Sequence, residues 1–255
     1  MNRLVLSAVM VARELLRNQT AVALLFLVPT ILYLLIHATT GERAIAFQLS
    51  GHGNATLEGS ERNLSLLFMG TTAMCGLAAF VAFVLTWRSI QTDRRLVFEG
   101  YRPSVLLAAK MLVVACAAAA VALYVAGLLL FFYLPERLAG VFLGFFVGGL
   151  TYGLLGVLIG VLSRRDLDGI LAILLLVNVD PGWLQNPVFY AEAHNRGIIH
   201  WLPAHHSCQL VMLSALTETS LRNEAVLCAG WLVSLGIVAV FLYRQRIGIV
   251  RRWDA

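Results

Sequence analysis

The residues with the clearest potential for chemistry are histidines that gather in the C-terminal third of the chain. The group comprises His194, His200, His205 and His206, beside Glu192. Imidazole and carboxylate groups can bind transition metals, but the adjacent His205 and His206 cannot easily face one site on a helix. We therefore interpret the group as solvated or hydrogen-bonded loop histidines near the lipid headgroups, and we expect no metal site.

Motifs for hydrolysis and nucleotide binding are missing from the sequence. There is no His-Glu-x-x-His, and serines in apolar segments, such as Ser65 and Ser234, have no histidine at helical spacing. The four cysteines lie far apart, without metal-ligand spacing. A phosphate-binding loop needs Gly-Lys-Ser/Thr, but the only lysine is Lys110, between Ala109 and Met111. We predict that the chain is no enzyme and holds no cofactor, so any ATP hydrolysis belongs to a separate chain.

The composition is typical of a membrane protein. Of the 255 residues, 60% are hydrophobic and 13% are charged, against about 25% charged in an average soluble domain. One soluble core of this size cannot hide so much apolar surface, so the excess must face lipid. The net charge of +5 could suggest nucleic acid. Because the basic residues gather on one side of the predicted membrane, we expect lipids as partners and no nucleic acid.

Six apolar segments follow an amphipathic stretch at residues 1–18. In this stretch apolar residues recur at helical spacing and Arg13 and Arg17 lie on the polar face, which predicts a helix in the membrane interface. The predicted spans are Thr20–Ile36, Leu64–Trp87, Ser104–Leu134, Leu138–Ser163, Gly169–Val179 and Ala225–Tyr243.

Two of these segments have unusual lengths. The third is longer than a hydrocarbon core of roughly 30 Å requires, so we expect its start, including Lys110, to project into the cytosolic interface. The fifth reaches only about 17 Å before Asp180-Pro181-Gly182 interrupts it.

The distribution of charge indicates that all six segments cross the membrane. With both termini in the cytosol, 14 basic residues lie inside and five lie outside, in agreement with the positive-inside rule. If the fifth segment did not cross, four arginines near the C-terminus would lie outside. We therefore predict six crossings with cytosolic N- and C-termini.

The outer stretch at residues 180–224 is too apolar for a free loop. It contains Trp183, Trp201 and several leucines, and Pro181, Pro187 and Pro203 break it. Irregular backbone at membrane depth must be covered by protein, so we predict short re-entrant helices in the outer leaflet. The predicted fold is an all-α integral membrane protein that forms one domain over residues 1–255.

Small residues form a row along the fourth predicted span. Gly149, Gly153, Gly156 and Gly160 share one helical face, and such rows let backbones approach closely. Packing within the chain, a contact between protomers, and a wall facing substrate are all compatible with this row.

No internal energy source is evident. Proton- and voltage-driven carriers place ionisable residues inside their spans, and the middles of the predicted spans hold none. The bundle is therefore either a passive pore or is driven by a partner.

The cytosolic segment between the second and third spans is longer than a connector needs. It reads RSIQTDRRLVFEGYRPSVLLAAK from Arg88 to Lys110, with mixed charges, Phe98 and Tyr101, and then a helix-start signal at Pro103. Aromatic and arginine residues together favour protein interfaces. At residues 88–103 we predict a short docking helix for a cytosolic partner, with a solvated turn as the alternative.

The order of these features resembles the permease subunits of type 2 ATP-binding-cassette (ABC) exporters. The resemblance covers essentially the whole chain. It rests on the N-terminal helix, six spans, Glu99-Gly100 followed by Pro103-Ser104, the glycine-rich fourth span ending in Leu162-Ser163-Arg164-Arg165, and Trp201-Leu202-Pro203 before the sixth span.

The resemblance implies an assembly in the bacterial cytoplasmic membrane. Two permease copies, identical or paralogous, would form the path, and two separate ATPase subunits would bind ATP and Mg beneath them. The segment between spans two and three would act as the coupling helix. The implied ATPase contacts are Gln91, Arg94, Arg95, Phe98, Glu99 and Tyr101, with Arg13 and Arg17 of the N-terminal helix.

A substrate with substantial apolar surface, such as a drug or a lipid, suits spans that offer aromatic and aliphatic side chains without fixed charge. The candidate path residues are Tyr33, Phe68, Met69, Thr71, Thr72 and Met74, for each of which plain helix packing is the alternative. The alternative function is a partnerless small channel or a membrane scaffold subunit.

Overall fold

The computed structural model describes residues 3–49, 56–186 and 196–248. In chain order its elements are α1 (Arg3–Arg17), α2 (Gln19–Thr39), β1 (Ala44–Gln48), β2 (Thr56–Ser60), α3 (Glu61–Phe98), α4 (Pro103–Leu129), α5 (Leu138–Leu162), α6 (Asp166–Val179), the π-helix η2 (Asp180–Leu184), α8 (Arg196–His200), α9 (His205–Leu216) and α10 (Arg222–Gly248). Pro187, Glu192 and His194, named above for the outer stretch, lie outside the described residues.

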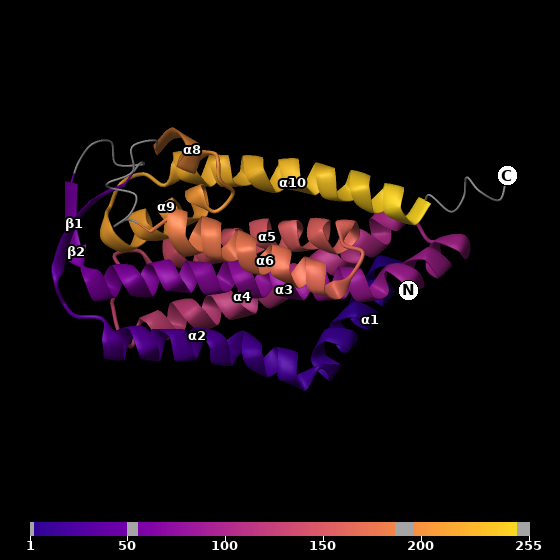
Figure 1. Cartoon of the computed structure of the whole chain (residues 1–255), viewed down its shortest axis with the longest axis horizontal. Helices are drawn as coiled ribbons and strands as arrows, with labels where there is room; N and C mark the ends of the chain where they lie inside the picture. Colours follow the sequence, from indigo (N-terminus) through magenta and orange to yellow (C-terminus); the bar gives the residue numbers. More distant parts are fainter. Residues whose placement is uncertain (1–2, 50–55, 187–195, 249–255) are drawn as a thin grey trace.

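Six helices within the described ranges are long and apolar enough to cross a membrane. They run side by side along the longest axis of the molecule (Figure 1). The chain is therefore a multi-pass membrane protein, and each predicted apolar segment corresponds to one of these helices.

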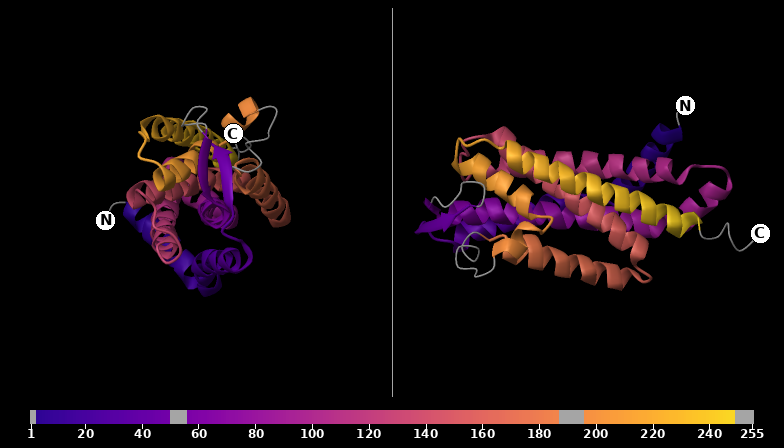
Figure 2. Two further views of the ribbon diagram at one scale, coloured as in Figure 1. Left: turned by 90° about the vertical axis from the view of Figure 1, so that its left-hand side faces the viewer. Right: turned by 90° about the horizontal axis from the view of Figure 1, so that it is seen from above.

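The bundle has two ends of different construction (Figures 1 and 2). One carries the strands β1 and β2 together with α8 and α9, and we call it the hairpin end. The other carries α1, the turn at residues 99–102 and the last turns of α10, and we call it the terminal end. That the terminal end faces the cytoplasm stays a prediction.

The core lies along α3 and α5. In each of these helices 67% of the residues of the apolar stretch are buried, against 17% in α2 and in α10. The glycines of α5 explain this difference, because they let two helices approach it closely. A β-carbon at Gly156 would collide with the carbonyl oxygen of Ala79 on α3, and one at Gly144 would collide with Val211 on α9.

The four glycines of the predicted row are all buried within the protomer. Gly149, Gly153, Gly156 and Gly160 are buried and face residues of α3 and α4. In this protomer the row is therefore occupied by the protein's own helices.

A β-hairpin interrupts the otherwise helical fold that the sequence predicts. β1 and β2 pair antiparallel, with Ala44 opposite Ser60. Phe47 of β1 is 1% exposed and belongs to the same buried cluster as Leu64 at the start of α3. The alternation of Phe47 with small or polar neighbours is too short a pattern to identify a strand by itself.

The fifth span is longer than the eleven residues predicted for it. α6 ends at Val179, but the helix continues as η2, so that the candidate span covers Asp166–Leu184. The prediction that the span middles hold no ionisable residue did not include Asp180, which lies near the end of this longer span and is 2% exposed.

Candidate partner-coupling site

The segment predicted as a separate docking helix is the end of α3. This 38-residue helix continues without a break from Glu61 at the hairpin end to Phe98 at the terminal end. Residues 88–98 therefore belong to the same rod as the second span, and only residues 99–102 form a connection to α4.

A glycine ends this helix. Gly100 has φ of 91°, its N–H donates to the carbonyl of Val97 (3.1 Å), and the N–H of Tyr101 donates to the carbonyl of Leu96 (3.0 Å). These two bonds form a Schellman motif, which needs the left-handed conformation that glycine adopts without strain. Pro103 then starts α4 with its φ already helical.

Most of the predicted partner-binding residues are exposed. Phe98 is 60% exposed, although a phenylalanine gains stability from burial. The exposed members are Gln91, Arg95, Phe98 and Glu99 on or beside the end of α3 and Arg13 and Arg17 on α1, whereas Arg94 and Tyr101 are half-buried. We call Gln91, Arg95, Phe98 and Glu99 the α3 tip.

The N-terminal helix contacts the turn beside the α3 tip. Arg3 donates a hydrogen bond to the carbonyl of Gly100 (3.1 Å), and its guanidinium lies 5.2 Å from the ring centre of Tyr101. Ser7 and Ala8 are buried, whereas Val9 and Leu16 are exposed. An amphipathic helix of this kind suits the membrane interface. Through Arg3, α1 therefore connects the predicted helix at the membrane surface to the turn at residues 99–102.

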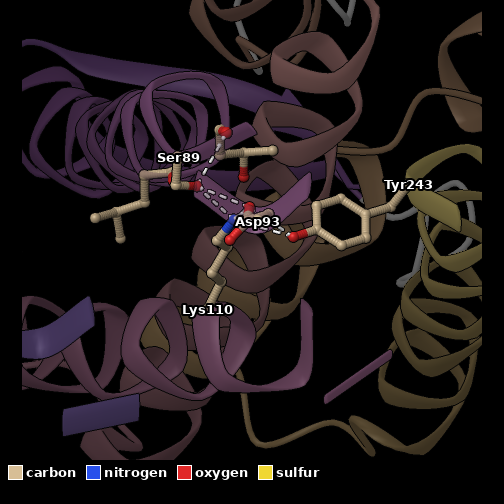
Figure 3. Close-up of polar contacts among 6 residues, drawn as sticks. Ser89, Asp93, Lys110 and Tyr243 are labelled. Carbon is tan, nitrogen blue, oxygen red and sulfur yellow. Dashed lines mark hydrogen bonds and ion pairs between the residues drawn. The ribbon is translucent and has the colours of Figure 1, made fainter. Parts of the chain in front are cut away.

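Behind the α3 tip, a buried polar network joins three helices (Figure 3). Lys110 of α4 donates to the carboxylate of Asp93 on α3, and the two form an ion pair. Tyr243 of α10 donates to the same Asp93 oxygen (2.8 Å), and Ser89 donates to it at 3.0 Å. Lys110 and Asp93 are 2% and 4% exposed, so this ion pair is shielded from water.

A second bond supports the same junction. The guanidinium of Arg94 donates to the backbone carbonyl of Arg246 on α10 (3.1 Å). α3 is therefore tied to α10 at two points near the terminal end.

The ion pair of Asp93 and Lys110 is costly to break. Removing one partner of a buried ion pair leaves an uncompensated charge and costs about 3–5 kcal/mol. We therefore expect α3, α4 and α10 to move as one body near the terminal end.

Lys110 is more buried than a position at the membrane interface suggests. It was expected in the cytosolic interface, but it is almost fully buried because its ammonium group finds Asp93 inside the helix junction. One sequence signal was available. Ser89 and Asp93 are four residues apart and share a helix face.

The six candidate path residues lie inside the protomer. Tyr33, Phe68, Thr71 and Met74 are buried, and Met69 and Thr72 are half-buried. The hydroxyl of Thr72 donates to the carbonyl of Pro181 (2.9 Å), and the buried hydroxyl of Tyr33 has no hydrogen-bond partner within the described ranges. A path along these residues stays a prediction.

His205 and His206 near the hairpin end are hydrogen-bonded, and the three described histidines there, these two and His200, lie in helices and not in loops. His205 and His206 begin α9 and are 0% and 9% exposed. Nδ1 of His206 lies 2.7 Å from a carboxylate oxygen of Glu224. Within the described ranges, no group of three or more histidine, cysteine, aspartate or glutamate residues is arranged to hold a metal ion.

Comparison with known proteins adds no family assignment. The chain matches no model of a protein family, and no curated protein matches it. The resemblance to ABC permeases therefore rests on the sequence pattern, and the six helices show a multi-pass membrane protein.

Proposed function

We propose that this chain is the membrane-spanning permease subunit of an ATP-driven type 2 ABC exporter. Two copies of a separate ATPase subunit bind ATP and Mg and dock at the terminal end, and a second permease copy, identical or paralogous, completes the path. The observation that carries the proposal is the α3 tip, an exposed aromatic and charged surface on a rod that runs through the whole bundle.

The surface chemistry of the tip supports a protein partner. Phe98 offers apolar area, and Arg95 and Glu99 offer charges of both signs beside it. Interface cores favour aromatic residues and arginine, with polar groups at the rim. A terminal end in the cytoplasm gives such a partner access to ATP.

The connections behind the tip support transmission of force. A displacement of the tip acts on α3 itself, on α4 and α10 through Asp93, and on α1 through Arg3. The far end of α3 lies beside the hairpin (Figure 1). ATP-driven closure of the partner subunits would therefore tilt the bundle as a whole and open a path for outward movement of a hydrophobic or amphipathic substrate, such as a drug or a lipid.

A charge reversal at the tip tests this function. We expect the full chain, purified in detergent from its native membrane, to co-elute with a nucleotide-binding subunit and with Mg-dependent ATPase activity. Glu99→Arg should abolish the transport-coupled ATPase and leave membrane insertion intact. Glu136→Arg is the matched control, because Glu136 is also exposed but lies between α4 and α5 at the hairpin end.

Two outcomes would contradict the proposal. A stable functional assembly without any nucleotide-binding subunit would favour the small channel or the scaffold subunit. If the Glu99→Arg variant keeps the transport-coupled ATPase activity of the wild type and is purified in the same yield as Glu136→Arg, the α3 tip is not part of the docking surface.

A further inference from the structure

A second buried carboxylate lies toward the hairpin end, apart from the coupling site. Asp180 begins η2, at the point where the fifth span changes from α- to π-helix. Its carboxylate accepts hydrogen bonds from the hydroxyl of Tyr152 on α5, from the side-chain amide of Gln185 (2.9 Å) and from the backbone N–H of Ala204 (3.1 Å). Three separate parts of the chain therefore meet at one carboxyl group.

No cation faces Asp180 from the described residues around it. The titratable groups near it are Cys75 of α3, Tyr152 of α5, and His205 and Cys208 of α9. All of these are neutral at physiological pH in ordinary surroundings except the imidazole, which titrates near it. Ionisable groups at membrane depth without a charge partner are typical of sites that bind ions or protons.

The imidazole of His205 is neutral as well. Burial, with a smaller effect of His200 and His206, lowers the pKa of His205 to about 3. At neutral pH this ring therefore carries one proton, on either Nδ1 or Nε2, and the partner that Nδ1 meets favours one of the two.

A chain of contacts connects Asp180 to an open cavity. The Oε1 atom of Gln185 lies 2.8 Å from Nδ1 of His205, and the ring centre of His205 lies 4.5 Å from that of His200. His200, His206 and residues of α10 line a cavity of about 690 Å³. Hydrogen bonds thus link Asp180 to His205 through one amide, and the ring of His205 packs against that of His200 at the cavity.

We propose that Asp180 is a proton-binding site and that Gln185 transmits its protonation state to His205 and to the cavity at His200. The proposal goes beyond the exporter function and does not depend on a partner ATPase.

The geometry gives each protonation state a different hydrogen-bond pattern. When Asp180 is ionised, the Gln185 amide donates to it and turns its oxygen toward His205, so Nδ1 of His205 must carry the proton. When a proton binds the Asp180 oxygen that faces Gln185, that oxygen donates and the amide must turn its oxygen toward it. The amide nitrogen then donates to Nδ1 of His205, which loses its proton to water while Nε2 takes one from water.

The test uses the full-length protein in detergent, labelled with ¹³C and ¹⁵N. NMR follows the carboxyl carbon of Asp180 and the two ring nitrogens of His205 from about pH 4 to about pH 9. In the wild type we expect the Asp180 carboxyl to titrate within this range and the protonated nitrogen of His205 to change with the same midpoint.

Two variants separate the steps. Asp180→Asn places an amide donor against Gln185, so His205 should hold its proton on Nε2 at every pH. Gln185→Met keeps Asp180 but removes the amide, so Asp180 should still titrate while His205 no longer follows it. Size-exclusion profiles and melting curves report whether each variant folds.

The wild type and Gln185→Met suffice if Asp180→Asn does not fold. An Asp180 carboxyl that stays ionised over the whole range in folded wild type would overturn the proton site. A His205 ring that still follows Asp180 in Gln185→Met, or that is the same in Asp180→Asn and wild type, would overturn the transmission through Gln185.

Discussion

Two of the three carboxylates that are buried among the described residues, Asp93 and Asp180, are stabilised in opposite ways. Asp93 at the terminal end is paired with the ammonium group of Lys110, whereas Asp180 toward the hairpin end accepts bonds from a hydroxyl and two amide groups and has no described cation beside it. An ion pair gives a buried carboxylate a counter-charge, whereas neutral donors supply hydrogen bonds without one. The terminal end is thus built as a fixed junction, and the hairpin end as a site that can respond to protons.

The largest expected effect comes from Lys110→Met. This change leaves Asp93 buried without its charge partner, and we expect the free energy of unfolding to fall by about 3–5 kcal/mol. Thermal melting of the detergent-solubilised protein, followed by size-exclusion chromatography, measures the loss. The double variant Lys110→Met/Asp93→Leu should recover most of it. If the double variant is as unstable as the single one, the ion pair does not explain the junction.

A pair of tyrosine variants compares the two carboxylates directly. Tyr152→Phe removes one of three neutral donors from Asp180, and Tyr243→Phe removes a donor from Asp93 but leaves Lys110 in place. A hydrogen bond to a charged group contributes about 1.5–3 kcal/mol, so near neutral pH Tyr152→Phe should reach this range and Tyr243→Phe should fall below it.

The same pair has a pH dependence that sharpens the comparison. Because Asp180 can take a proton in place of the lost bond, the cost of Tyr152→Phe should shrink as the pH falls, while the smaller cost of Tyr243→Phe should stay constant. Equal costs at every pH would show that the two carboxylates are held in the same way.

A further pH dependence concerns His205. Its pKa is lowered to about 3 in the fold by burial first and by its histidine neighbours second, whereas an unfolded histidine titrates at about 6.5. Between these values the unfolded chain binds more protons, so the stability that His205 contributes is complete above about pH 6.5 and is lost as the pH falls. Melting curves of the wild type should therefore show a steeper loss toward low pH than those of His205→Phe. An equal loss of stability toward low pH in the wild type and in His205→Phe would contradict the lowered pKa of His205.

Several features of the coupling site could be predicted from local sequence. The exposed Phe98 and Glu99 follow a long apolar run, and Gly100 and Pro103 are the residues that end one helix and start the next. The pairing of Asp93 with Lys110 could not be predicted, because the two residues are 17 positions apart on different helices and their contact depends on how those helices are rotated.

At the hairpin end the sequence was less informative. Asp180, Pro181 and Gly182 together favour a break in a helix, and the residues after Asp180 therefore seemed to leave the span. The structure continues the turn as a π-helix because the donors of Tyr152 and Ala204, from distant parts of the chain, satisfy the carboxylate at membrane depth.

The sequence alone determined that this chain lies in a membrane, where its six apolar helices are and which helix is rich in glycine, because length, apolar content and helical spacing are properties of each segment by itself. Only the tertiary structure decided which ionisable groups are buried and which of them are paired. Burial and pairing depend on the faces that two helices turn toward each other, and no single segment contains that information.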